Sequence, residues 1–207
     1  MKNLIKLITY FIFLLVLISC LPHEKKIVLQ PYENFDKSII DTIVNSLTII
    51  YGYDVDILPK RKIQKTAFVN IKSPRYRAHS LLIDLKESKP DSVDIILGLI
   101  NKDISTTKRN KNGTVKKPES KYFDWGIYGL GYRPGPSCIV STYRLNNMNK
   151  KLFFSRLKKI CIHEVGHNLG LPHCATNKCV MQDAAETIKT VDNVNMELCT
   201  KCKSKIG

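Results

Sequence analysis

Three histidines and one glutamate in the last quarter of the chain have a spacing suited to metal chemistry. Residues 163–173 read His-Glu-Val-Gly-His-Asn-Leu-Gly-Leu-Pro-His. His163 and His167 are four residues apart, so on a helix both imidazoles project from one face and one zinc ion can bridge them. Glu164 follows the first of these ligands and can direct its carboxylate toward a metal-bound water without binding the metal itself. The pattern therefore predicts a catalytic metal site on a helix.

The end of the same motif supplies a third ligand. Gly170 is free to take a positive φ, which ends a helix and lets the chain turn back, and Pro172 reinforces the stop. His173 would then return to the same metal. Three neutral imidazoles leave the fourth tetrahedral position open to water or substrate, and an open position is what separates catalytic from structural zinc. We therefore predict a catalytic zinc ion held by His163, His167 and His173.

Four of the seven cysteines form a second candidate metal site directly after this motif. They are Cys174, Cys179, Cys199 and Cys202. Four thiolates in two local pairs suit a closed, tetrahedral structural zinc, and the two-residue gap between Cys199 and Cys202 is a typical metal-knuckle spacing. Two disulfides are the alternative, which export from the cytoplasm would favour. We expect structural zinc here, because the cluster adjoins the catalytic motif.

Taken together, the two clusters resemble the archaemetzincin signature in residue type and spacing. The resemblance rests on His163-Glu164-x-x-His167-x-x-Gly170-x-x-His173-Cys174, four residues, Cys179-x-Met181, seventeen residues and Cys199-x-x-Cys202. It implies a compact α/β metzincin-like zinc peptidase with a mixed twisted sheet, an active-site helix, a carboxyl-terminal structural-zinc segment and two zinc ions per chain. It further implies that Glu164 is the general base and that Met181 occupies the Met-turn, a hydrophobic floor beneath the histidines.

The expected reaction is hydrolysis of a peptide bond in a peptide or protein substrate. Zinc would activate a water, and Glu164 would take the water proton and deliver it to the leaving amine. We expect the substrate to lie extended along an edge strand beside the cleft, formed by Trp125–Tyr132 or Cys138–Tyr143. The alternative function is that of a catalytically weak or inactive metal-binding envelope lipoprotein with a binding role.

The first twenty residues are predicted to be a targeting segment. Lys2 and Lys6 precede an apolar run of 12 residues, Leu7–Ile18, which is shorter than the ~20 residues that a membrane-spanning helix needs. The sequence Leu-Ile-Ser-Cys at residues 17–20 resembles a bacterial lipobox, in which Cys20 is acylated. An uncleaved anchor and an ordinary secretory signal are the alternatives. A lipoprotein anchored by Cys20 would lie in the bacterial cell envelope, facing the periplasm or the exterior.

These features divide the chain into three parts. Residues 1–19 are predicted to be the lipoprotein signal peptide, residues 20–31 a tether, and residues 32–207 the peptidase domain. We expect the mature protein to be a monomer attached to the membrane through lipidated Cys20.

Net charge is a weaker indication of function than the two clusters. The formal charge of the 207 residues is +15, and removal of residues 1–19 leaves +13. Such an excess is compatible with nucleic acid, an anionic membrane or an acidic substrate. Seven lysines and arginines fall in residues 101–121, which we predict to be a long loop. Because the chain has no recognised nucleic-acid motif, we expect no nucleic-acid partner.

Periodicity predicts the elements that must position these residues. Helices are expected over 34–50, ended by Gly52, over 75–87 and over 150–169. Strands are expected over 53–58, 66–71, 93–100, 125–132 and 138–143. Cys138 and Cys161 lie outside both clusters. We expect both to be buried free thiols; a disulfide is the alternative if their Cα atoms come within ~7 Å.

Overall fold

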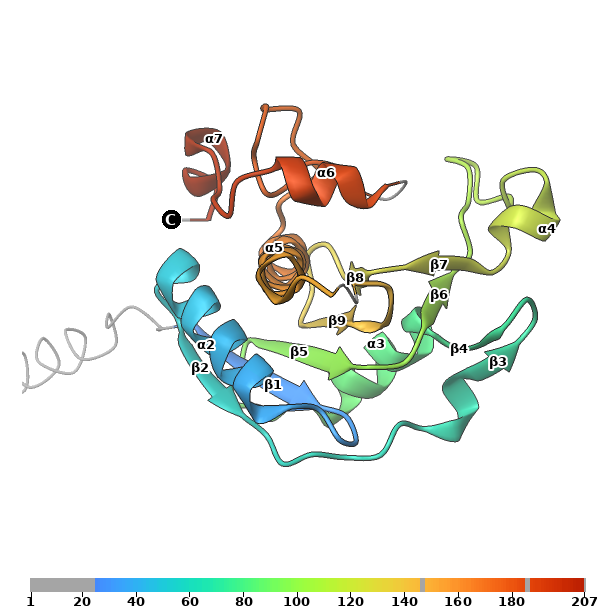
Figure 1. The fold of residues 1–207 in the computed structure, drawn as a ribbon, viewed down its shortest axis with the longest axis horizontal. Coiled ribbons are helices and arrows are strands. Elements are labelled where there is room, and N and C mark those ends of the chain that lie inside the picture. The colour runs from blue at the N-terminus through green and yellow to red at the C-terminus, as the bar shows by residue number, and fades with distance from the viewer. Residues whose placement is uncertain (1–24, 146–147, 185–186, 207) are drawn as a thin grey trace, which may run out of the picture.

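The structure is a computed structural model that describes residues 25–145, 148–184 and 187–206 (Figure 1). The predicted signal peptide, residues 1–19, and the predicted lipidation site Cys20 lie outside the described residues. Within the described ranges, no helix combines the length and the apolar character needed to cross a membrane.

A five-stranded mixed sheet lies at the centre of the molecule. Its strands, in spatial order, are β2 (Asp54–Ile57), β1 (Lys26–Pro31), β5 (Ile95–Ile100), β9 (Ser137–Ser141) and β8 (Gly129–Gly131). The first four run parallel, and β8 pairs antiparallel with β9 at one edge. Since β9 lies between β5 and β8, the prediction that residues 138–143 form an edge strand for substrate is wrong. At this end of the sheet the edge strand is β8, and at the other end it is β2.

A second sheet continues from this edge. It contains β3 (Phe68–Asn70), β4 (Pro74–Arg77), β6 (Ile104–Thr106) and β7 (Trp125–Ile127), in that order. The chain passes from β7 almost directly into β8, so the predicted strand over 125–132 is divided between the two sheets (Figure 1). The backbone N–H of Ser141 donates to the Tyr128 carbonyl at the junction, over 2.8 Å. This arrangement places residues 125–131 along one continuous rim.

Helices cover both faces of the five-stranded sheet. The helices of the described chain are α2 (Lys37–Tyr51), α3 (Ala78–Ser88), α4 (Glu119–Tyr122), α5 (Lys150–Asn168), α6 (Ile188–Asn193) and α7 (Thr200–Lys203), with 3₁₀ turns at Lys65–Ala67 and Tyr143–Leu145. Figure 1 shows α2 and α5 on one face, α3 on the other, and α6 and α7 beyond α5. Strand β5 is buried on both faces: Leu97 belongs to the core cluster under α2 and α5, and Ile96 to the cluster under α3.

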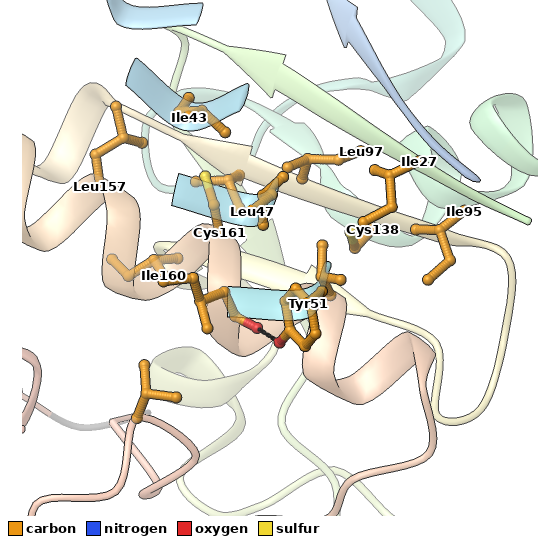
Figure 2. Close-up of a cluster of buried hydrophobic side chains, with 14 of the residues drawn as sticks. Ile27, Ile43, Leu47, Tyr51, Ile95, Leu97, Cys138, Leu157, Ile160 and Cys161 are labelled. Atoms are coloured by element: carbon orange, nitrogen blue, oxygen red, sulfur yellow. Dashed lines mark hydrogen bonds between the residues drawn. The ribbon is translucent and has the colours of Figure 1, made fainter. Parts of the chain in front are cut away.

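The active-site helix is positioned by this first core cluster. Figure 2 shows side chains of α2, α5 and the sheet strands meeting in it. The hydroxyl of Tyr51, at the end of α2, donates to the carbonyl of Ile162 on α5 over 2.6 Å, and both residues are buried. Since Ile162 immediately precedes the first histidine, this bond fixes α5 next to the predicted catalytic motif.

Both long helices have end signals in their own sequences, of which Gly52 and Gly170 were predicted. The Asp36 carboxylate accepts from the Ser38 N–H at the start of α2, and Gly52 ends that helix with φ 68°. Asn149 caps α5 by accepting from the Leu152 N–H. Gly170 follows the end of α5 with φ 91°, as expected of the residue at which the chain turns back. The predicted mixed α/β fold is confirmed, and the cysteine cluster lies in the carboxyl-terminal segment as expected.

The tether predicted for residues 20–31 is wrong for residues 26–31. These residues form β1, which pairs with β2 on one side and with β5 on the other. Ile27 and Leu29 are fully buried on the face under α2. The flanking charges and Pro31 conceal this short apolar run in the sequence, although strand β1 lies inside the sheet. The peptidase domain therefore includes β1.

The loop predicted for residues 101–121 is also partly wrong. It contains β6, and α4 begins at Glu119. Asp103 is buried and accepts from the Arg144 guanidinium, with Nε to Oδ1 at 2.6 Å. A long-range ion pair of this kind orders a segment that local composition marks as a solvated loop. The predicted helix over 75–87 begins only at residue 78, because residues 74–77 form β4.

Candidate active site and metal centre

Helix α5 and the turn after it bring the three predicted histidines together. The ring centroids of His163 and His167 lie 4.6 Å apart, and that of His173 lies 5.3 and 5.0 Å from them. Their candidate ligand atoms all lie within 4.8 Å of one another. The turn at Gly170 makes this possible, because it returns the chain over the helix end. Three imidazoles that converge on one point form a ligand set of catalytic zinc sites.

Hydrogen bonds from the Nδ1 atoms orient the histidines. The Nδ1 of His163 lies 2.9 Å from the Val180 carbonyl oxygen, and that of His167 lies 2.7 Å from the Leu171 carbonyl oxygen. Because a carbonyl only accepts, each Nδ1 carries the proton and donates it. The third ring is held differently: His173 Nδ1 lies 3.4 Å from a carboxylate oxygen of Asp183.

These partners leave the Nε2 atoms of His163 and His167 unprotonated and available to a metal. Such outer contacts are the usual support of histidine ligands. Burial lowers the pKa of His163 to about 3, and the neighbouring His167 adds to the shift. The pKa of His167 is likewise lowered, first by burial. Both rings are therefore neutral at pH 7, as zinc ligands must be. The residues present fit a catalytic zinc ion.

Glu164 lies in the same cavity as the three histidines. This cavity has a volume of about 440 Å³ and is bounded by residues of α5, by the rim of β7 and β8, and by the segment that leads into α6. The side chain is buried, and this burial raises the pKa of the carboxyl to about 8. A cation on the histidines would oppose the shift, because positive charge favours the carboxylate. A carboxyl with a pKa near neutrality is suited to exchange protons with substrate.

Two glycines of β8 make room for Glu164. A Cβ on Gly129 would come 2.7 Å from Glu164 Oε1, and a Cβ on Gly131 would come 2.9 Å from the Glu164 carbonyl oxygen. A side chain at either position would therefore collide with the glutamate. Neither glycine was among the predicted site residues. A Gly-x-Gly pattern inside an expected strand is the signal that would have indicated them, since such glycines mark a close approach.

Met181 packs against α5 directly beneath the motif. It is fully buried, and a Cβ on Gly166 would lie only 2.5 Å from its sulfur. The backbone carbonyl of Met181 accepts from the N–H of Cys174 over 2.8 Å. The residue before it, Val180, supplies the carbonyl that orients His163. This short segment therefore connects the histidine site with the cysteine cluster.

The four predicted cysteines meet in one cluster. Cys174 and Cys199 have their sulfurs 3.8 Å apart, and Cys179 and Cys202 have theirs 3.9 Å apart. Bonds of about 2.3 Å to a tetrahedral zinc require sulfurs about 3.8 Å apart, whereas a disulfide requires about 2.05 Å. All four are free thiols in the structure. The cluster therefore fits one zinc ion and does not have the geometry of two disulfides.

The remaining described cysteines do not join either site. Cys138 on β9 and Cys161 on α5 are buried free thiols, as predicted. Burial raises the pKa of each thiol well above its ordinary value. Both therefore behave as small apolar core residues of the cluster in Figure 2.

Comparison with known proteins identifies the family. A model of peptidase family M54 matches residues 25–207. An archaemetzincin of Saccharolobus solfataricus is 33% identical over 190 residues, which cover 88% of this chain and 93% of the relative. An archaemetzincin of Archaeoglobus fulgidus is 29% identical over 181 residues, covering 87% and 98%.

Solved structures agree with this assignment. The crystal structure of the archaemetzincin from Methanopyrus kandleri has a TM-score of 0.71 at 26% identity and covers 89% of this chain and 94% of its own. That of the archaemetzincin from Archaeoglobus fulgidus, complexed with malonate, has a TM-score of 0.68 at 26% identity, with coverage of 87% and 99%. The chain therefore belongs to peptidase family M54, the family of the archaemetzincins, and is a zinc metallopeptidase.

Proposed function

We propose that this metallopeptidase cleaves peptide bonds with one zinc ion on His163, His167 and His173 and with Glu164 as the general base. Zinc bound there would supply Lewis-acid chemistry, lowering the pKa of a water and polarising the scissile carbonyl. The observation that carries the proposal is the placement of a buried carboxyl in the same cavity as three convergent imidazoles. No residue of the predicted catalytic set lies elsewhere.

The protein groups around the site have distinct tasks. Glu164 accepts one proton from the attacking water as the new carbon–oxygen bond forms, and it delivers that proton to the amine nitrogen as the carbon–nitrogen bond breaks. No covalent bond to the protein is required. The outer edge of β8 offers backbone groups to an extended peptide, because β8 pairs with β9 on its other side alone. Gly129 and Gly131 keep this edge close to Glu164.

The decisive test compares the wild type with Glu164→Gln on a peptide library. The amide is nearly isosteric but cannot accept a proton as a carboxylate does, so we expect turnover to fall at least ~100-fold, the usual contribution of a general base. Both zinc ions should remain, as measured by metal analysis. Full activity of the variant would refute the assigned base. Absence of turnover in the wild type would support the alternative, a metal-binding protein without useful catalysis.

We propose that the cysteine cluster holds the second zinc ion. Four converging thiols and the sulfur separations support this assignment. Metal analysis together with intact mass tests it. Two zinc ions per chain and four reduced cysteines are expected, whereas one zinc ion and a mass lower by four hydrogens would indicate two disulfides.

We also propose that the mature chain is a monomer anchored through acylated Cys20. Support for the anchor comes from the sequence of residues 1–20 alone, with its basic start, apolar run and lipobox-like end. Every residue of the proposed site comes from one chain, so the site is complete without a partner copy. The intact mass of protein extracted from a bacterial membrane should show loss of residues 1–19 and added acyl chains. Replacement of Cys20 by Ala should release the protein from the membrane.

A further inference from the structure

The active-site cavity continues past the histidines into a recess between α5 and α6. Apolar side chains in the lining of the cavity include Ile127, Ile160, Val180, Val191 and Val194. One charged side chain of α5, Lys159, also lines the recess. It is 8% exposed, so its ammonium group lies largely out of contact with water. Burial of a cation without a partner of opposite charge is energetically costly.

Lys159 lies on the same face of the helix as the metal ligands. It precedes His163 by four residues, which places the two side chains on one face about 6 Å apart along the helix axis. Both residues also line the same cavity. The recess is therefore within reach of a substrate residue beside the scissile bond.

In the described part of the chain, Lys159 bonds to backbone carbonyls and not to a carboxylate. Its Nζ donates to the carbonyl oxygens of Val191 at 2.9 Å and of Asp192 at 3.2 Å. Among the residues that the structure describes, no carboxylate oxygen lies within 4.0 Å of this nitrogen. The carboxylate of Asp192 is engaged by Arg156, with Nε to Oδ1 and Nη2 to Oδ2 both at 2.7 Å.

One donor and one positive charge therefore remain for a ligand. An ammonium group has three N–H donors, of which two are used here. A buried charge without a partner of opposite sign is costly, so an entering anion gains both an ion pair and a charge-assisted hydrogen bond. Burial lowers the pKa of Lys159, whereas the nearby Asp192 opposes that shift. An entering carboxylate would likewise favour the charged ammonium.

We propose that this recess binds an acidic side chain of the substrate next to the scissile bond, with Lys159 contacting its carboxylate. The inference rests on the proposed peptidase function. Glutamate matches the recess best: its methylenes contact the apolar walls, and its carboxylate reaches the ammonium. Lys159 would then be a specificity-determining residue on the active-site helix itself.

The test must separate this role from a purely structural one. The two hydrogen bonds from Lys159 Nζ hold the carbonyls of Val191 and Asp192 in the last turn of α6. Such bonds stabilise a helix end without any ligand. Lys159→Met retains the length and apolar stem of the side chain and removes the ammonium. Lys158→Met is the matched control, since Lys158 is the next residue of α5, is only partly buried and does not line the cavity.

The first readout is the kcat/KM of paired peptides. In each pair, one of the two residues flanking the scissile bond is glutamate in one peptide and glutamine in the other. At one of the flanking positions, the wild type and Lys158→Met should cleave the glutamate peptide with a kcat/KM at least ~10-fold higher than that of the glutamine peptide. A charge-assisted hydrogen bond provides a difference of this size. The difference should lie in KM. Lys159→Met should lose this preference, so that the ratio of kcat/KM for the two peptides falls to about one.

A second readout does not require turnover. In the Glu164→Gln background, calorimetry with the same peptides should give a Kd at least ~10-fold lower for glutamate than for glutamine, and Lys159→Met should abolish the difference. Equal binding of both peptides would overturn the proposal. The proposal would also be overturned if Lys159→Met lost the same affinity for both peptides and had a lower Tm, because Lys159 would then serve only to hold α6. Failure of the proposed peptidase function would instead appear as absent turnover in the wild type.

Discussion

The backbone of Gly129 lies directly against the carboxylate of Glu164: a Cβ on Gly129 would come 2.7 Å from Oε1 and 2.8 Å from Cγ of the glutamate. The edge strand β8 and the proposed general base thus share one tightly packed contact. Any side chain at position 129 must move the carboxylate or the strand that is expected to bind substrate.

Gly129→Ala is therefore expected to lower kcat. Displacement of the base by a fraction of an ångström weakens proton transfer, and we expect a loss of at least ~10-fold. Zinc content should be unchanged, because the three atoms nearest to such a Cβ all belong to Glu164 and none to a histidine. Steady-state kinetics combined with metal analysis checks both points. Unchanged kcat in this variant would show that Glu164 tolerates the displacement.

Removal of one histidine should remove one metal and leave the other. His167→Ala is expected to reduce the zinc content from about two ions per chain to about one, since the cysteine cluster has its own four ligands. His79→Ala is the matched control, because His79 is exposed and belongs to neither candidate metal site. Metal analysis of both purified variants is the measurement. Retention of both ions by His167→Ala would argue against this histidine as a ligand.

Met181 should act through its volume and not through its sulfur. Met181→Leu preserves the volume and should lower the free energy of unfolding by less than about 1.5 kcal/mol, with zinc retained. Met181→Ala should lower it by about 2–5 kcal/mol, because the fully buried side chain leaves a cavity.

The exposed Met148 offers the matched control, and Met148→Ala should have almost no effect. Chemical denaturation and metal analysis measure these outcomes. Loss of zinc in Met181→Leu would indicate a direct role of the sulfur in metal binding.

If the substrate forms backbone hydrogen bonds with the outer edge of β8, its cleavage should be sensitive to N-methylation of its backbone. Each methyl group that blocks a bond to the strand edge should reduce kcat/KM about 3–10-fold, corresponding to ~1 kcal/mol per hydrogen bond. Methylation should matter at alternate residues only, since successive groups of an extended chain point to opposite sides. A methyl scan through one good substrate tests this. Equal hydrolysis of all methylated peptides would exclude β8 as the docking edge.

The ion pair between Arg156 and Asp192 should make the attachment of α6 sensitive to acid. The Arg156 guanidinium lowers the pKa of Asp192 in the folded chain. A depressed pKa stabilises the folded state above the unfolded value of about 3.9, and this contribution is lost as pH falls through the folded value.

Asp192→Asn should therefore lower the free energy of unfolding at pH 7 by about 1 kcal/mol, with a lower Tm, and its Tm should approach that of the wild type as the pH falls below the unfolded pKa of about 3.9. Asp41→Asn is the matched control, because its ion pair with Lys37 on α2 is exposed and should contribute little. Thermal unfolding between pH 3 and 7 checks both. A pH-independent Tm difference for Asp192→Asn would assign its effect to packing instead of charge.

Local signals account for what could be predicted without coordinates. The four-residue spacing of His163 and His167 follows from helical periodicity, and the turn that returns His173 follows from Gly170. Helix α2 has both end signals in its own sequence, at Asp36 and Gly52. Each of these features depends on residues within one or two turns of each other, so the candidate ligand set, the candidate general base and the family could all be predicted from the sequence alone.

Tertiary packing decided the features that depend on strand order and long-range contacts. Strand β1 has its partners β2 and β5 far along the chain, so its buried position was not visible in a short segment with flanking charges and a proline. The identity of the substrate edge depended on whether β8 or β9 was outermost. Lys159 reads in the sequence as one more surface lysine of a basic helix; only the approach of α6 buries its ammonium beside the active site. Local sequence determines which groups are available for chemistry, whereas burial and neighbouring elements determine which of them face the substrate.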